Sequence, residues 1–381
     1  MAHLSDLPED PIVEEVKSTA SRLELARRYR ELDRSPEFPR REFRALADAG
    51  LIGLHTSRDL GGRGLPLPRT GIALFHLARL GGTAFAKLSL QPEFSSVLAE
   101  HGSRELVEEW FRPLMRGERL IGNQITEPGA GSDAAAIALR AQPSGDGYLL
   151  DGEKSEVAFA CDAEAAIVYG RVPASHPRRE ITAFLVPQDL DGITRKRDAP
   201  DLGERWMCRG TVHYRGVRLP AGFRIGEEGK GFEYVRSELT RERALLAAVY
   251  LGVAHASWEE TVEHVGARTA FGKPLSAQEG VAFPLVEDEA RLESAWLYTE
   301  RVLERLEGGD RVEAPAALAK WLATDTALQT LDHAIQFHGG RGYSGDLPHE
   351  QRWRDVRSGG IAHGPSEIMR LIAARRLWPT H

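Results

Sequence analysis

The chain has 381 residues, of which 42% are hydrophobic and 28% are charged. A chain of this size and composition buries a large core, so it is expected to fold rather than to remain disordered. Its 49 basic and 56 acidic residues give a formal net charge of −7, and they are spread without a block of like charge. A nucleic acid or an anionic membrane is therefore not an expected partner.

Cysteine usage and the N-terminal residues suit a protein of the cytosol. Cys161 and Cys208 are the two cysteines, and they have neither metal-ligand spacing nor a disulfide framework, so no metal site is predicted. Residues 1–11 lack a basic segment followed by an apolar run. No window is apolar enough to span a membrane. We expect a cytoplasmic, unprocessed protein without a membrane partner.

The first third of the chain has the periodicity of amphipathic helices. Apolar residues recur three and four positions apart over residues 10–30 and 38–49, which places them on one helix face. Residues 61–68 hold three glycines and two prolines, a composition typical of a loop. Helical periodicity then returns over residues 70–80 and 94–111.

The middle of the chain changes to short runs that predict strands. Apolar or alternating runs punctuated by glycine, proline and aspartate occupy residues 148–150, 165–169, 182–186 and 211–214, as expected for a small sheet or barrel. Long helical runs with broad apolar faces follow at residues 232–269, 278–306 and 315–337, as in a helical bundle.

These patterns predict an α+β fold that is mostly α. We expect an N-terminal α-helical domain over residues 1–120 and a small central β-barrel or sheet domain over residues 121–229. A C-terminal four-helix bundle is expected over residues 230–381.

The most specific string runs from Gln124 to Asp133 and reads Gln-Ile-Thr-Glu-Pro-Gly-Ala-Gly-Ser-Asp. Its small residues let a ligand approach the backbone, and the hydroxyls of Thr126 and Ser132 offer hydrogen bonds. Such clusters are also ordinary in turns. The string closely resembles the Thr-Glu-Pro-x-Ala-Gly-Ser-Asp signature of acyl-CoA dehydrogenases, and the resemblance extends over essentially the whole chain.

Further matches to that family follow in the family's order. They are a strand ending at Val217-Arg218-Leu219-Pro220, the bundle entry from Ile225 to Phe232, the element from Arg268 to Leu275 with Gln278, the loop from Gln336 to Tyr343, and Arg354-Asp355 with Gly364. The resemblance implies an FAD-dependent dehydrogenase that acts on the CH–CH group of an acyl thioester (enzyme class EC 1.3).

The resemblance also implies which residues meet the cofactor and the substrate. Ile125 and Thr126 would contact the pyrimidine edge of the flavin, and Ser132 would contact the acyl-pantetheine. A diphosphate needs cations and bare backbone amides, which fits a second group, supplied in the family by a neighbouring subunit: Arg268, Phe271, Gln278, Gln336, Gly339 and Gly340. A homodimer, usually doubled to a homotetramer, is therefore implied.

Dehydrogenation of a thioester needs a base for the α-proton, in an apolar pocket that raises its pKa. In most of the family this base is a C-terminal glutamate, whose position here is His363. A second arrangement in the family puts the glutamate on a bundle helix before an arginine, which corresponds to Glu242. We take Glu242 as the base, with Arg243 along the acyl-pantetheine channel. A solvated ion pair is the alternative for Glu242.

Two further features depart from the family and keep other functions open. His363 is a neutral filler, a second acid/base group or the principal catalyst of altered chemistry. A tryptophan and a hydroxyl that face the flavin in the family are replaced by Glu156 and Ala158, although Phe159 offers aromatic cover. A carboxylate there would disfavour the anionic reduced flavin.

Three functions follow from these features. The first is an FAD-dependent dehydrogenase of an acyl thioester whose acyl group is carried by coenzyme A or by an acyl-carrier protein. Electron-transfer flavoprotein or oxygen would be the electron acceptor, and a carrier-protein substrate would suit a role in secondary metabolism. The second is a non-redox acid/base enzyme that catalyses elimination or isomerisation with a weakened or lost flavin. The third is an inactive partner subunit of a hetero-oligomer.

Overall fold

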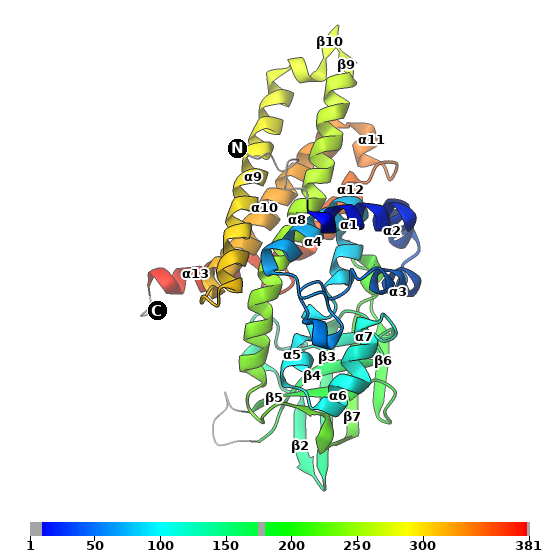
Figure 1. Ribbon diagram of the computed structural model, residues 1–381, viewed down its shortest axis with the longest axis vertical. Helices are drawn as coiled ribbons and strands as arrows, with labels where there is room; N and C mark the ends of the chain where they lie inside the picture. The colour runs from blue at the N-terminus through cyan, green and yellow to red at the C-terminus, as the bar shows by residue number, and fades with distance from the viewer. Residues whose placement is uncertain (1–9, 174–179, 379–381) are drawn as a thin grey trace.

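The computed structural model describes residues 10–173 and 180–378. Its N-terminal part is helical (Figure 1) and comprises α1 Pro11–Arg22, α2 Leu25–Arg34, α3 Arg40–Asp48, α4 Leu67–Ser89, α5 Ser96–His101, α6 Arg104–Leu106, the π-helical turn η4 Val107–Phe111 and α7 Arg112–Met115. The helix expected over residues 10–30 is divided, because Glu24 adopts a left-handed φ of 50° between α1 and α2. The helix expected over residues 94–111 is likewise divided into short segments.

Helix α4 is the centre of the N-terminal part and is buried on nearly all sides. It kinks at Gly82, where φ is 68° and ψ is −172°. A Cβ at Gly82 would lie 2.5 Å from the ring of Tyr29, so only glycine allows both the backbone conformation and the close packing of α2 against α4.

The middle part is a mainly antiparallel sheet with the order β6-β7-β3-β2-β4-β5-β8, in which β1 pairs in parallel with β4. The strands are β1 Ile121–Gln124, β2 Arg140–Ser144, β3 Gly147–Val157, β4 Ala165–Arg171, β5 Ile181–Pro187, β6 Ile193–Arg197, β7 Gly210–Pro220 and β8 Arg224–Ile225. All four predicted runs lie in strands. The polar strands β2 and β6 escaped prediction because most of their residues are exposed.

Strand β4 is buried along its length because both of its faces are covered. Ile167 and Tyr169 belong to the core shared with the helices, whereas Ala166 and Val168 belong to a second core on the other face of the sheet. Alternate residues of a strand point to opposite faces. Tyr169 therefore faces the helices.

The C-terminal part is a helical bundle built around α8 Gly231–Ala267. The 37 residues of α8 correspond to a length of about 55 Å, and Figure 1 shows α8 running from the sheet to the hairpin at the other end of the molecule. The other elements are β9 Thr269–Ala270, β10 Lys273–Pro274, α9 Glu279–Glu307, α10 Glu313–Phe337, α11 Gly340–Tyr343, α12 His349–Arg357 and α13 Ser366–Leu377.

Helix α8 is apolar on every side in its middle, where residues 244–254 are all buried. It packs against α4, α9 and α10, so an all-round apolar surface is what its position requires. Short 3-10 turns link the larger elements: η2 Arg58–Leu60, η3 Glu93–Ser95, η5 Ala134–Ala136, η7 Arg205–Met207, η8 Ala221–Phe223, η9 Leu275–Ala277 and η10 Ser358–Gly360. The expected order of helices, sheet and helical bundle is confirmed.

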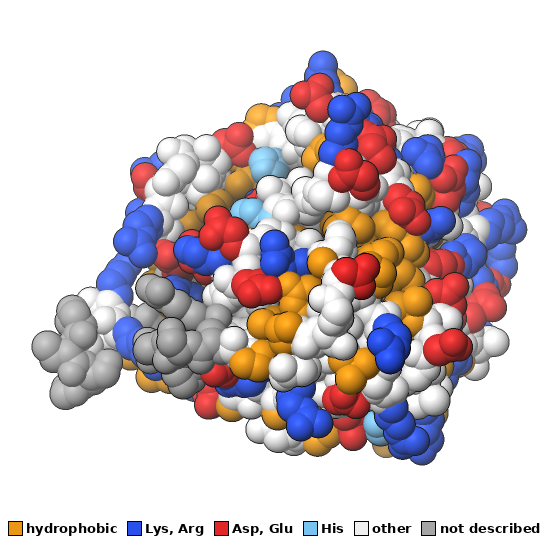
Figure 2. Space-filling model, turned by 90° about the horizontal axis from the view of Figure 1, so that it is seen from below, with side chains coloured by type: hydrophobic (Ala, Val, Ile, Leu, Met, Phe, Trp, Pro, Cys, Tyr) orange, Lys and Arg blue, Asp and Glu red, His pale blue; other side chains and the backbone are white. Residues whose placement is uncertain are grey.

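The surface at the sheet end carries charges of both signs. Figure 2 shows basic and acidic side chains interspersed on that face, with apolar patches between them. Among residues 10–173 and 180–378, no helix has both the length and the apolar character needed to cross a membrane.

Candidate active site

Glu242 lies in the buried stretch of α8 and is only 2% exposed. Burial raises the pKa of its carboxyl to about 8, against the opposing effect of the Arg241 and Arg243 charges. Neither arginine is ion-paired to it: Arg241 pairs with Glu93 and Glu100. The alternative of a solvated ion pair for Glu242 is therefore wrong.

His363 approaches Glu242 from the loop that follows α12. Its Nε2 lies 3.6 Å from Oε2 of Glu242, and its ring stacks on Phe94 with centroids 5.5 Å apart. The backbone at His363 has a φ of 55°, a strained conformation for a residue other than glycine. Such strain persists only where neighbouring contacts impose it.

Two cations hold the loop in this conformation. Arg243 Nε donates to the carbonyl oxygen of His363 at 3.0 Å. Lys320 Nζ donates to the carbonyl oxygens of Ala362 and Gly364, the latter at 2.7 Å. Three successive carbonyls are thus fixed by side chains of α8 and α10, which directs the imidazole toward Glu242.

The electrostatics of the site leave His363 neutral. Burial lowers the pKa of His363 well below its usual value, and the charges of Lys320, Lys87 and Arg243 lower it further. Burial also lowers the pKa of Lys320 to about 7. A carboxyl with a raised pKa thus faces an uncharged imidazole, an arrangement suited to moving a proton.

The segment at Ile125 and Thr126 is fixed by a buried ion pair. Lys154 Nζ donates to the carbonyl oxygen of Ile125 at 2.9 Å and to Glu127 at 2.8 Å, and the Ser155 amide donates to the carbonyl oxygen of Thr126 at 3.0 Å. This anchoring presents the edge of the segment as a rigid surface. Ser132 is exposed further along the same loop.

The replaced residues near that segment are engaged elsewhere. Glu156 is exposed and forms an ion pair of 2.8 Å with Arg209, so its charge is partly compensated. Phe159 is buried between Phe38 and Trp206, at ring distances of 5.4 and 5.5 Å. The expectation that Phe159 supplies aromatic cover to a flavin is therefore wrong, because the core already uses its ring.

The second group of predicted cofactor residues lies at the far end of α8 (Figure 1). Arg268 caps the C-terminus of α8, and Phe271, on the β9–β10 hairpin, is 97% exposed. The junction of α10 and α11, where Gln336, Gly339 and Gly340 lie, is beside that end, since His338 stacks on His264 of α8 at 4.2 Å. Gln278, at the N-terminus of α9, directly follows this hairpin region. One chain therefore joins Glu242, Arg243 and His363 in one site and keeps these six residues apart from it.

Family comparisons cover all three parts of the chain. The N-terminal domain of acyl-CoA dehydrogenase matches residues 9–118, its middle domain matches residues 122–217, and its C-terminal domain matches residues 229–378. The chain belongs to the acyl-CoA dehydrogenase family. The resemblance seen in the sequence is thereby confirmed, as is the family's cofactor, FAD.

Relatives of known activity are moderately similar. The chain is 30% identical over 352 residues to the 3-(aryl)acrylate reductase of Clostridium sporogenes, covering 91% of this chain and 92% of that protein. It is 32% identical over 351 residues to benzylmalonyl-CoA dehydrogenase of Aromatoleum aromaticum, with 91% and 92% coverage. Butyryl-CoA dehydrogenase of Megasphaera elsdenii has the same fold, with a TM-score of 0.90, 27% identity and coverage of 98% and 99%.

The chain retains surfaces that fit the family's FAD. A Cβ built at Gly129, Gly131, Gly339 or Gly340 would meet no atom within 4 Å, so ligand atoms can reach the backbone there. The ring of Phe271 is free of intrachain packing. The charge of Glu156, the main departure from the family on this surface, is partly compensated by Arg209.

Some residues of the site escaped sequence analysis. Lys320 stands alone among the apolar residues of α10, and a lone lysine in such a run is a signal that was available. Glu238 precedes Glu242 by one helical turn and shares its face of α8. Asn123 and Tyr169 join them from β1 and β4, which only the folded chain reveals.

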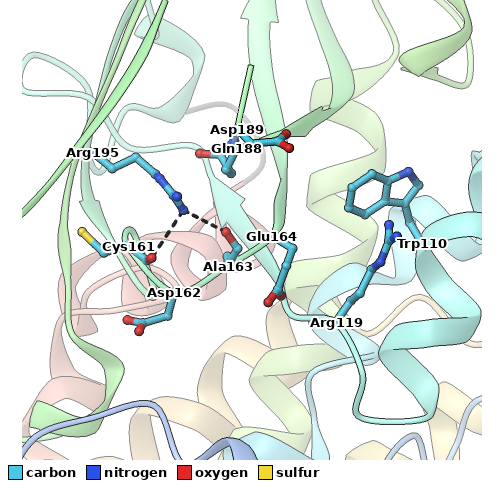
Figure 3. A pocket seen from close by; sticks show the side chains of 9 residues that line it. All are labelled: Trp110, Arg119, Cys161, Asp162, Ala163, Glu164, Gln188, Asp189 and Arg195. Carbon is cyan, nitrogen blue, oxygen red and sulfur yellow. Dashed lines mark hydrogen bonds between the residues drawn. The ribbon is translucent and has the colours of Figure 1, made fainter. Parts of the chain in front are cut away.

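A separate pocket of about 420 Å³ opens beside the sheet (Figure 3). Arg195 on one side donates to the carbonyl oxygens of Cys161 and Ala163 at 3.4 and 3.0 Å. Arg119 on the other side lies over the ring of Trp110 at 4.2 Å. Arg195 is thus hydrogen-bonded and Arg119 stacked on an aromatic ring, and none of the predicted site residues lines this pocket.

Proposed function

We propose that this chain is an FAD-dependent dehydrogenase of an acyl thioester, in which Glu242 removes the α-proton. The reaction breaks one C–H bond at each of the α and β carbons and forms a double bond between them. The α-proton passes to the Glu242 carboxylate. FAD, when bound, accepts the hydride from the β-carbon.

The observation that carries the proposal is the environment of Glu242. A buried carboxylate whose pKa is about 8 is a much stronger base than a solvated glutamate, and the α-proton of a thioester is only weakly acidic. His363, neutral and 3.6 Å from Glu242, would hydrogen-bond to the substrate or to the base. Arg243 and Ser132 would line the path of the acyl-pantetheine.

The cofactor site requires a second copy of the chain. Ile125 and Thr126 directly follow strand β1 of the sheet, whereas Arg268, Phe271 and Gln278 follow the C-terminus of α8, at the end of that helix away from the sheet. A homo-oligomer would bring the hairpin of one copy to the sheet of another, as the family resemblance implies. The acyl carrier would be coenzyme A or an acyl-carrier protein, and electrons would leave to electron-transfer flavoprotein or oxygen.

The test is an anaerobic titration of the FAD-reconstituted protein with a panel of short-chain, aromatic and aminoacyl thioesters. A substrate of the natural protein is expected to bleach the oxidised flavin. Glu242→Gln should keep its flavin but lose at least about 100-fold in the rate of reduction. Glu233→Gln, an exposed position on the same helix, is the matched control and should behave as the natural protein does.

Other outcomes favour the alternative functions. A colourless protein that does not bind FAD on reconstitution would overturn the proposal in favour of non-redox acid/base chemistry or a partner-subunit role. A Glu242→Gln variant that reduces flavin at the natural rate would remove Glu242 from the mechanism and leave the dehydrogenase reaction to another base.

A further inference from the structure

A second buried carboxylate lies beside the proposed base. Glu238 precedes Glu242 by one turn of α8, and each is only 2% exposed. Burial and the charge of Glu242 together raise the pKa of Glu238 well above its usual value. Arg241 does not neutralise Glu238 by direct pairing, because Arg241 forms its ion pairs with Glu93 and Glu100.

Three buried oxygens at and around Glu238 have no hydrogen-bond partner, although Oε2 of Glu238 accepts from Asn123. Asn123 Nδ2 donates to Oε2 of Glu238 at 3.2 Å and to the carbonyl oxygen of Phe94 at 3.4 Å. Within the described part of the chain, Oε1 of Glu238, Oδ1 of Asn123 and the hydroxyl of Tyr169 have no hydrogen-bond partner. Because buried polar atoms are usually paired, we take these three acceptors beside the proposed base as candidates to receive hydrogen bonds from a bound substrate.

Tyr169 belongs to the same cluster. Its side chain faces the helices from β4 and is 1% exposed. Burial raises the pKa of its phenol well above the usual value, and the nearby charges of Glu238 and Glu242 raise it further. The cluster adjoins the proposed active site through Phe94, which contacts both the Asn123 amide and the ring of His363.

We infer that this cluster binds an amine on the acyl group, so that the substrate of the proposed dehydrogenase is an aminoacyl thioester. A hydrocarbon acyl chain would leave all three oxygens unpaired. A hydroxyl has a single hydrogen to donate, whereas an ammonium group donates as many as three hydrogen bonds. Its positive charge also offsets the repulsion between Glu238 and Glu242, which allows the base to remain ionised beside a second carboxylate.

This inference rests on the proposed function, and binding measurements separate the two. The full-length protein, reconstituted with FAD, is titrated anaerobically in a calorimeter with pantetheine thioesters in two isosteric pairs. Prolyl is compared with cyclopentanecarbonyl, and β-alanyl with butyryl. In at least one pair, the amine is expected to bind about 10- to 100-fold more tightly than its carbon isostere, as for a hydrogen bond to a charged group.

Variants assign the preference to Glu238. Glu238→Leu is expected to abolish it, and Glu238→Gln, which keeps shape and one acceptor but no charge, to reduce it at least about fivefold. Glu233→Gln, exposed on the same helix, should retain it. Equal affinity within both pairs overturns the inference, as does a preference that persists in Glu238→Gln. Flavin reduction without any preference for an amine leaves the dehydrogenase proposal standing, whereas a preference without flavin reduction overturns only the dehydrogenase.

Discussion

Replacing Lys87 by methionine removes one charge from an enclosed ionic network that joins the three parts of the chain. Lys87 on α4 is 1% exposed, and its Nζ lies 2.5 Å from Oε1 of Glu204. The Glu204 amide donates to Asp355 at 2.5 Å, and Ser358 Oγ donates to the Glu204 carboxylate at 2.5 Å. Without Lys87, two buried carboxylates remain with no cation in contact with Glu204.

The loss of stability follows from that arrangement. Removing one partner of a buried ion pair leaves an uncompensated charge and costs about 3–5 kcal/mol. The two carboxylates already repel each other, because burial and the charge of Glu204 raise the pKa of the Asp355 carboxyl to about 7. A double variant, Lys87→Met with Glu204→Gln, removes the orphaned charge and is expected to recover at least about 1 kcal/mol of that loss.

The measurement is urea unfolding at neutral pH, followed in parallel by tryptophan fluorescence and circular dichroism. Lys17→Met is the matched control, because Lys17 forms an exposed ion pair with Glu14 and such pairs contribute little. The reasoning is refuted if Lys87→Met unfolds at the same urea concentration as Lys17→Met, or if the double variant is less stable than Lys87→Met.

Four further predictions concern the proposed active site and the cofactor surface. Because Glu242 must be ionised to act as a base, the rate of flavin reduction should rise with pH through an apparent pKa near 8, and a flat profile would contradict this. The pKa of Glu242 in the folded protein exceeds its ordinary value of 4.5, so between these values the folded state binds more protons than the unfolded state and stability falls as pH rises. The melting temperature of Glu242→Gln should therefore rise relative to that of the natural protein from acid to mildly alkaline pH. A difference that stays constant with pH would count against burial as the cause. Gly364→Ala should slow flavin reduction by up to about 100-fold at unchanged FAD content, because Gly364 has a φ of 92° and a Cβ would lie 3.2 Å from Arg243; normal rates would show that the loop conformation does not matter. Phe271→Ala should weaken FAD retention and oligomerisation in size-exclusion chromatography without altering the circular dichroism. Leu202→Ala, at another exposed position, is the control and should keep both FAD and the oligomer. A Phe271→Ala variant that keeps its FAD and the oligomer of the natural protein would argue against a second copy at the cofactor.

The sequence determined the order of helices, sheet and helical bundle, and it singled out Glu242 and His363, whose side chains lie 3.6 Å apart in the structure. The helical runs and apolar strands are local periodicities, which is why residues 232–269 and 165–169 were recognised with nearly correct limits. Divisions within helices were not recognised. The left-handed turn at Glu24 has no local signal, because the position is not a glycine and the apolar periodicity continues across it.

Only the tertiary structure decided the electrostatics of the site. The sequence left a solvated ion pair open as the alternative for Glu242, but Arg241 pairs with Glu93 and Glu100 while burial raises the pKa of Glu242. Burial and charge pairing depend on residues that are distant in the chain, and the grouping of Asn123, Tyr169 and Glu238 has the same origin. The sequence therefore indicated the family, whereas the packing of α8 against the sheet and the C-terminal loop set the proton affinity of Glu242, the proposed base, and the polarity of its surroundings.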